Sequence, residues 1–66
     1  MQIRVNGEAR EVPDGASVGE LVAIFQLAAE RVAVEVNERL VRRAVFGQTR
    51  LQPGDRVEIV TLVGGG

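Results

Sequence analysis

Only one stretch of this sequence carries apolar residues at helical spacing, and this constrains the fold more than any other feature. The stripe recurs every three or four positions and comprises Val18, Leu21, Val22, Phe25 and Ala28 or Ala29, with Ile24 partly off it and able to widen it. Elsewhere the apolar residues mostly alternate with polar ones, which is the period of a strand. A single helix among several strands predicts a sheet with the helix packed across one face.

The helix is expected to begin at a capping box. The Ser17 hydroxyl would accept a hydrogen bond from the Glu20 amide, and the Glu20 carboxylate would accept one from the Ser17 amide. We assign both residues to capping and not to catalysis, because the chain offers no base to activate the hydroxyl.

The first residues predict a hairpin. Residues 1–6 alternate between apolar and polar side chains, and Asn6-Gly7 is the strongest short signal for a hairpin turn. Residues 8–12 should return antiparallel, close to an edge of the sheet, because Val12 is their only large apolar residue. Pro13-Asp14-Gly15 is expected to end this strand.

The middle of the chain predicts a second pair of strands. Residues 32–36 alternate with three valines on one face, and a tight turn at residues 37–38 leads into a short strand over residues 39–41. Residues 42–49 are irregular. We expect Val45 and Phe46 to close one end of the core from a short helical turn that Gly47 ends.

The last strand is predicted to be the longest, and it and the first strand are both predicted to be well buried. Residues 52–55 form a turn with Pro and Gly at its centre, and residues 56–63 follow with apolar side chains on both faces, as in a central strand. We therefore place the first and last strands side by side in the middle, with the helix connection leading to outer strands. The prediction is an α+β domain over residues 1–63, with one helix across a mixed sheet of four to five strands.

Missing residue types exclude many kinds of site. The sequence contains no Cys, His, Lys, Trp or Tyr. A metal site, a disulfide framework, a thiol nucleophile and a Schiff base are therefore not expected. Its net charge of −1 argues against nucleic acid as a partner. The first residues do not resemble a signal peptide and no apolar run could span a membrane, which predicts a cytoplasmic protein.

Three glycines, Gly64, Gly65 and Gly66, follow the last strand. They add nothing to a core and are expected to form a flexible tail that reaches about 10 Å when extended. Such a tail fits a narrow channel in a partner and presents the Gly66 carboxylate without steric hindrance. A frayed end or a remnant of cloning is the alternative interpretation.

Two sets of surface residues allow two interpretations each. The positive charge of Arg39, Arg42, Arg43 and Arg50 suits docking onto an acidic partner, but a solvated face balanced by Glu35 and Glu38 is the favoured alternative. Val60 and Leu62 could form an exposed apolar patch beside the tail, whereas a place in the core is more common for single apolar residues.

Four segments resemble the ThiS family of sulfur carrier proteins. They are Met1-Gln2-Ile3-Arg4-Val5-Asn6-Gly7-Glu8, the Pro13-Asp14-Gly15 loop leading to Val18-Gly19-Glu20-Leu21-Val22, Arg31-Val32-Ala33-Val34-Glu35-Val36-Asn37, and Pro53-Gly54-Asp55-Arg56-Val57-Glu58-Ile59-Val60 with the diglycine end. The family has the ubiquitin-like β-grasp fold, which agrees with the order of elements above. One departure is visible: the family commonly has Val-Pro-Arg and a turn with Trp where this chain has Val41-Arg42-Arg43 and Phe46.

The resemblance implies a carrier and not an enzyme. A ThiF-like enzyme would adenylate Gly66 with ATP, and sulfur from a cysteine desulfurase would convert it to a thiocarboxylate. Gly64 and Gly65 would enter the partner active sites, and a ThiG-like thiazole synthase would take the sulfur for thiamine. No metal or bound cofactor is implied.

Two alternatives stay open. One is a MoaD-like small subunit of molybdopterin synthase, or a carrier for another sulfur pathway, although those relatives tend to be longer. The other is a β-grasp module that binds partners without covalent chemistry and whose glycines are inert.

Overall fold

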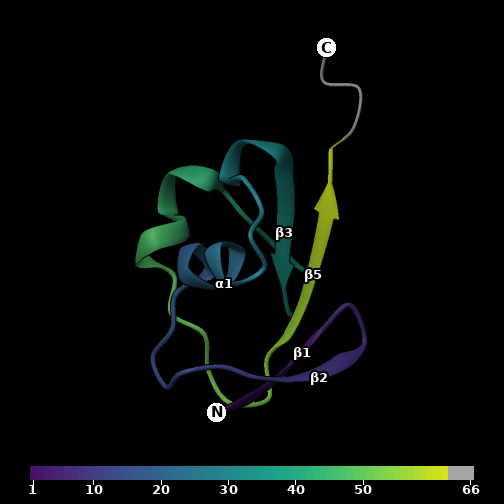
Figure 1. Cartoon of the computed structure of the whole chain (residues 1–66), viewed down its shortest axis with the longest axis vertical. Helices are drawn as coiled ribbons and strands as arrows, with labels where there is room; N and C mark the ends of the chain where they lie inside the picture. The colour runs from purple at the N-terminus through teal and green to yellow at the C-terminus, as the bar shows by residue number, and fades with distance from the viewer. Residues whose placement is uncertain (63–66) are drawn as a thin grey trace.

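The computed structural model describes residues 1–62, which form a five-stranded mixed sheet with one α-helix on one face (Figure 1). The sheet order is β2-β1-β5-β3-β4. The strands are β1 (Gln2–Val5), β2 (Glu8–Glu11), β3 (Val32–Val36), β4 (Arg39–Val41) and β5 (Arg56–Thr61); the helix is α1 (Val18–Ile24), and two 3₁₀ turns are η1 (Ala29–Arg31) and η2 (Arg43–Gln48). The predicted α+β architecture is confirmed.

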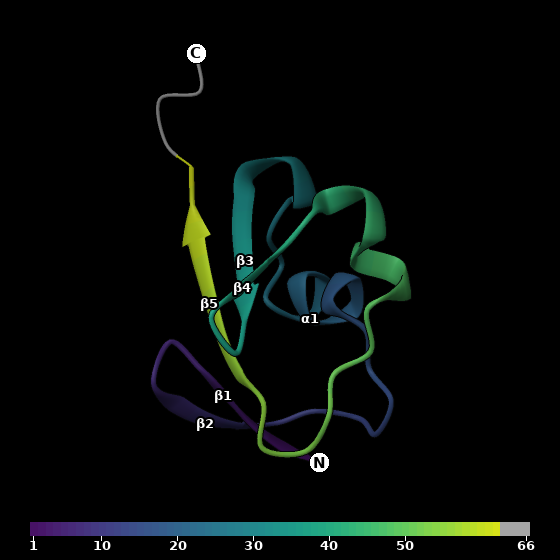
Figure 2. The same ribbon diagram turned by 180° about the vertical axis from the view of Figure 1, so that it is seen from behind.

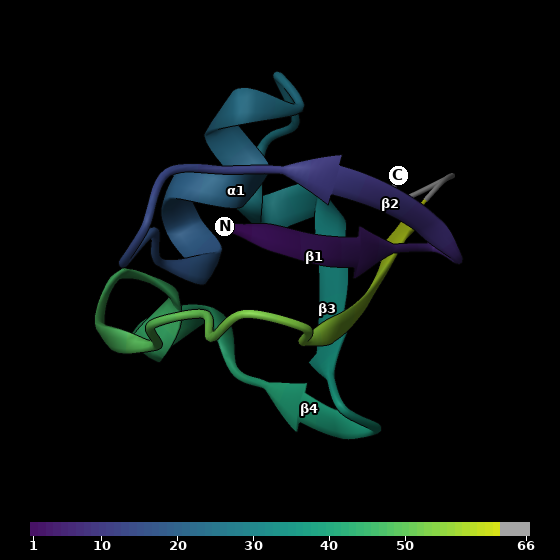
Figure 3. The same ribbon diagram turned by 90° about the horizontal axis from the view of Figure 1, so that it is seen from below.

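The first and last strands lie side by side within the sheet, as predicted. β5 pairs in parallel with β1 and antiparallel with β3, while β2 and β4 form the two edges (Figure 3). The connection through α1 leads to β3, which lies beside β5, and β4 is the outer strand on that side. β4 leads into η2, which lies next to α1 (Figure 2).

Both predicted hairpin turns are present and depend on positive φ angles. Asn6 and Gly7 have φ of 51° and 85°, and Asn37 and Glu38 have φ of 52° and 70°. Positive φ at both central residues is typical of the two-residue turn whose twist suits a hairpin. Asn tolerates this conformation better than most residues, which explains why the two turns begin with it.

The capping box of α1 is confirmed. The Glu20 amide donates to Ser17 Oγ at 3.0 Å, and the Ser17 amide donates to the Glu20 carboxylate at 2.8 Å. The hydrogen bond from the Ser17 amide, followed by the influence of the Ser17 side chain, holds the pKa of the Glu20 carboxyl below its usual value. The negative charge of the Glu20 carboxylate in the first turn of α1 also complements the helix dipole.

The helix is shorter than its apolar stripe. Val18, Leu21 and Val22 are buried, but the helix ends at Ile24 and the chain turns at Gln26 with a φ of 59°. Ile24 is 52% exposed, so the expectation that it widens the buried face is wrong. Its side chain points away from the sheet because only one face of the helix meets the core.

The turn η2 closes one end of the core with one aromatic residue. Phe46 is 4% exposed, whereas Val45 is 39% exposed, so only half of the expected pair is buried. In a 3₁₀ turn consecutive side chains point about 120° apart, and only one of them can face inward. Gly47 does not end the turn, which continues to Gln48.

A buried loop residue completes the core. Leu51 is 2% exposed. Two backbone hydrogen bonds join its loop to the start of α1: the Val18 amide donates to the Thr49 carbonyl at 2.9 Å, and the Leu51 amide donates to the Ala16 carbonyl at 2.8 Å. The sequence pattern gave no sign of this role, because Leu51 lies between two turns.

β5 is fixed at both ends of its described length. Gly54, with a φ of 83°, forms the turn that leads into it, as predicted. The strand ends at Thr61, and the Leu62 amide donates to the Arg31 carbonyl at 2.7 Å. Val63 and the predicted tail Gly64–Gly66 lie outside the described residues. Within residues 1–62, no helix is long and apolar enough to cross a bilayer.

Candidate functional site

The last part of β5 projects beyond the first hairpin and forms the centre of the candidate site. β1 pairs with β5 only at Arg56 and Val57, whereas β3 pairs with β5 from Val57 to Thr61. Beyond Ile59, β3 is therefore the only backbone neighbour of β5 in the described part of the chain. The strand runs away from the end of the molecule where the N-terminus lies (Figure 1).

Asn6 ties β5 to the first hairpin at the point where their backbone pairing stops. The Asn6 side chain accepts from the Ile59 amide at 2.8 Å and donates to the Ile59 carbonyl at 3.1 Å. One side chain thus satisfies the amide and the carbonyl of Ile59, which in a continued parallel ladder would bond to two different residues of β1. Its partner lies 53 residues away in the sequence, so no local pattern indicated this contact.

Val60 and Leu62 are exposed on the face of the sheet that α1 does not cover. They are 58% and 51% exposed, and Val60 lies directly opposite Ala33 of β3. The alternative that places them in the core is wrong, because the chain has one α-helix in its described part and that helix covers the other face. Cross-strand partners share a face, so Leu40, opposite Glu35 and 66% exposed, lies on this face too.

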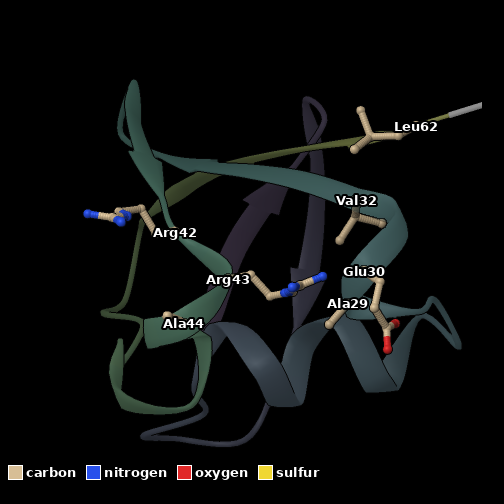
Figure 4. A pocket seen from close by; sticks show the side chains of 7 residues that line it. All are labelled: Ala29, Glu30, Val32, Arg42, Arg43, Ala44 and Leu62. Atoms are coloured by element: carbon tan, nitrogen blue, oxygen red, sulfur yellow. The ribbon is translucent and has the colours of Figure 1, made fainter. Parts of the chain in front are cut away.

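A pocket of about 480 Å³ lies beside the end of β5 (Figure 4). The residues that line it include Ala29, Glu30, Val32, Arg42, Arg43 and Leu62. Figure 4 shows the Arg43 side chain extending toward Ala29 and Glu30 and the Arg42 side chain extending the other way. We call it the arginine pocket. It brings together η1, the start of β3, the segment after β4 and the residue after β5, which are far apart in the sequence.

The four arginines that the sequence grouped together are divided by the structure. Arg42 and Arg43 line the arginine pocket, while Arg39 lies in β4. Arg50 follows η2 in the sequence and donates to the Gly15 carbonyl at 2.8 Å. Its positive charge also helps to lower the pKa of the Glu20 carboxyl. Arg50 therefore belongs to the loop that supports α1.

Several polar side chains of the described residues make structural hydrogen bonds. The Ser17 hydroxyl accepts from an amide in the helix cap, and within residues 1–62 no three acidic side chains gather in a geometry that could hold a metal ion. The Met1 ammonium lies between carboxylates, with Asp14 at 2.9 Å and Glu11 at 3.1 Å, and these hydrogen bonds raise its pKa above 8.0. This arrangement fastens the start of β1 to the loop after β2.

Comparison with known proteins gives a match over nearly the whole chain. A profile of the ThiS family matches residues 3–66. The crystal structure of the thiamine biosynthesis protein ThiS from Geobacter metallireducens is 36% identical, with a TM-score of 0.85 and all of both chains covered.

The curated relatives differ in length. The thiazole synthase of Magnetococcus marinus is 38% identical over 66 residues, which are the whole of this chain but 20% of that protein. The ycf40 protein of Porphyra purpurea is 35% identical, with all of this chain and 93% of that protein covered. This chain thus spans about a fifth of the thiazole synthase that it matches.

Proposed function

Since this chain belongs to the ThiS family, which comprises sulfur carriers of thiamine biosynthesis, we propose that it carries sulfur as a thiocarboxylate on Gly66. The observation that carries the proposal is the extent of the family match, which spans the sheet, β5 and the three glycines. The chain would act as a protein cosubstrate, and its partners would supply the catalytic groups.

The chemistry requires activation of a carboxylate. A chain-terminal carboxylate, with a pKa of about 3.3 to 3.7, is ionised at neutral pH and is a poor electrophile. A ThiF-like enzyme would join it to the α-phosphate of ATP and release pyrophosphate. Persulfide sulfur from a cysteine desulfurase would then attack the carbonyl carbon and the bond to AMP would break. A thiol would reduce the resulting acyl disulfide, which leaves the thiocarboxylate on Gly66 and the thiol oxidised to a disulfide.

The geometry of β5 suits this role. The Leu62 amide donates to the Arg31 carbonyl at 2.7 Å, so the last described residue is held against η1. Gly64, Gly65 and Gly66 follow, and residues without Cβ atoms can pass through a channel too narrow for other residues. Since ATP is consumed, we expect the protein to act in the cytoplasm.

Thiazole synthase is the proposed acceptor of the sulfur. Two relatives that match the whole of this chain, at 38% and 33% identity, are longer proteins named thiazole synthase. A carrier and its acceptor within one chain would keep the carrier at high effective concentration near the acceptor, which supports partnership between the separate proteins.

An intact mass measurement tests the proposal. The protein is incubated with a ThiF-like enzyme, ATP, a cysteine desulfurase with cysteine, and a thiol as reductant. We expect the mass of the chain to rise by the difference between one sulfur and one oxygen, and a variant that lacks Gly65 and Gly66 to stay unchanged. A wild-type mass that never changes would leave the non-covalent β-grasp module as the better interpretation.

Complementation distinguishes the two sulfur pathways. A strain that requires thiazole for growth should be rescued by this chain if it serves thiamine synthesis. A strain deficient in the small subunit of molybdopterin synthase should not. Rescue of the second strain alone would instead support the MoaD-like alternative.

A further inference from the structure

The dipeptide Asn6-Gly7 carries a reactive group that the proposed function does not use. In an Asn-Gly sequence the backbone nitrogen of the glycine can attack the side-chain carbonyl carbon of the asparagine, because glycine has no side chain to hinder the approach. The surroundings add no hindrance: Gly7 is exposed, and a Cβ atom placed on it would meet nothing within 4 Å. Within residues 1–62 the Gly7 amide also has no hydrogen-bond acceptor.

The second asparagine of the chain lies in a turn of similar geometry but lacks this neighbour. Asn37 has a φ of 52°, against 51° for Asn6, and its side chain also makes two hydrogen bonds. The residue that follows Asn37 is Glu38, whose side chain hinders attack by the backbone nitrogen. The two turns therefore differ in chemical reactivity although their backbones are alike.

Two hydrogen bonds hold the Asn6 side chain away from this reaction. Its oxygen accepts from the Ile59 amide at 2.8 Å and its nitrogen donates to the Ile59 carbonyl at 3.1 Å, so both polar atoms are bound to β5. We call this pair of hydrogen bonds the Asn6 clasp. The side-chain carbonyl carbon can meet the Gly7 nitrogen only when the side chain rotates and the Asn6 clasp opens.

We propose that Asn6 is a deamidation site whose reaction is limited by opening of the Asn6 clasp and whose main product cannot close it again. The Gly7 nitrogen forms a bond to the side-chain carbonyl carbon of Asn6. Ammonia leaves with the Gly7 amide proton, and a succinimide ring remains. Water then opens the ring at either carbonyl, which gives aspartate or, mainly, isoaspartate. The net reaction exchanges ammonia for water and needs no other reactant.

Isoaspartate changes the turn in two ways. Its backbone runs through the former side-chain carbon, so the two-residue turn between Val5 and Glu8 gains one atom and loses the geometry that suits a hairpin. The donor to the Ile59 carbonyl is also lost. Backbone pairing between β1 and β5 stops at Val57, so the modified hairpin would no longer be tied to the projecting end of β5. The reaction would thus mark aged copies of the chain at the strand that precedes the three glycines.

Peptide mass spectrometry of the full chain tests the site. Trypsin cleaves after arginine, so Asn6 lies in the peptide of residues 5–10 and Asn37 in the peptide of residues 32–39. During incubation at mildly alkaline pH, the first peptide should gain the mass difference between O and NH while the second stays unchanged. In urea, which opens the Asn6 clasp, the reaction of Asn6 should be at least about 10-fold faster than in the folded protein.

Hydrogen exchange at the Ile59 amide tests the consequence, because this amide donates to Asn6. In the isoaspartate form, purified by chromatography, it should exchange at least about 10-fold faster than in the unaged protein. The Leu21 amide, which donates to the Ser17 carbonyl in α1, should be unaffected.

Asn6→Asp is the matched control for charge. It adds the same negative charge without the extra backbone atom, and its carboxylate still accepts from the Ile59 amide. Exchange of that amide should therefore change less than about 3-fold.

Three results would overturn the inference. The first is conversion of Asn6 no faster than that of Asn37, and the second is an equal rate for Asn6 in the folded protein and in urea, which would show that the Asn6 clasp does not limit the reaction. The third is an Ile59 amide that exchanges equally fast in the isoaspartate form and in Asn6→Asp, which would refute the effect of the extra atom. None of these measurements depends on sulfur transfer, so they are independent of the test of the carrier function.

Discussion

Asn6→Gly isolates the hydrogen bonds that hold β5 against the first hairpin. Glycine keeps the positive φ of 51° that the turn requires, so the substitution removes the side-chain amide with little backbone strain. The amide makes two hydrogen bonds to Ile59, at 2.8 and 3.1 Å. Each contributes about 0.5–1.5 kcal/mol net, and the added freedom of glycine in the unfolded chain costs about 0.4–1 kcal/mol.

The expected loss in the free energy of unfolding is therefore about 2–3 kcal/mol. A domain of 66 residues has a total of only about 3–10 kcal/mol at the usual 0.05–0.15 per residue. Urea denaturation followed by far-ultraviolet circular dichroism measures the change, since the chain has no Trp or Tyr. With a slope of about 1 kcal/mol per M, the midpoint should fall by about 2 M.

Asn37→Gly is the matched control. Asn37 has nearly the same φ, 52°, at the same place in the other hairpin turn, and its side chain also makes two hydrogen bonds, both 3.0 Å long. Those bonds are exposed, so water can replace them and the loss should be about 1 kcal/mol or less. If Asn6→Gly costs no more than Asn37→Gly, the reasoning about β5 is refuted.

Two further predictions concern the core and the N-terminus. Phe46→Ala should destabilise the protein by about 3–5 kcal/mol and Val45→Ala by less than about 1 kcal/mol, because Phe46 is 4% and Val45 39% exposed; equal losses in urea denaturation would contradict the orientation of η2. The raised pKa of the Met1 ammonium means that its pairing with Asp14 stabilises the fold fully below pH 8.0 and is lost as pH rises through the folded-state pKa. Thermal melts from pH 7 to 10 should therefore show a decline that is smaller in Asp14→Asn, and equal declines would count against this pairing.

The sequence predicted local structure well where a few adjacent residues determine it. The turns at Asn6-Gly7 and Asn37-Glu38 and the cap formed by Ser17 and Glu20 depend on backbone angles and side chains within four residues of each other. The position of β1 beside β5 within the sheet could also be predicted, because both strands carry enough apolar residues.

Long-range contacts could not be predicted from local patterns. Asn6 suits the hairpin turn whether or not its side chain contacts Ile59. Only the parallel register of β1 and β5 places Asn6 beside Ile59. The arginine pocket depends in the same way on how η1, β4 and β5 converge. The sequence indicated positive charge in the second half of the chain. It did not indicate that Arg50 would donate to the Gly15 carbonyl while Arg42 and Arg43 line the pocket.

The exposure of Val60 and Leu62 follows from the size of the chain. A sheet has two faces, and the seven residues of α1 with the turn η2 cover one of them. Apolar residues on the other face stay in contact with water unless a partner covers them, at a cost of about 25 cal/mol for each Å² of apolar surface. Val60 lies in the part of β5 that projects beyond β1, and Leu62 follows directly after that strand. A partner that binds this end of β5 would cover both side chains, and the apolar area removed from water would stabilise the complex.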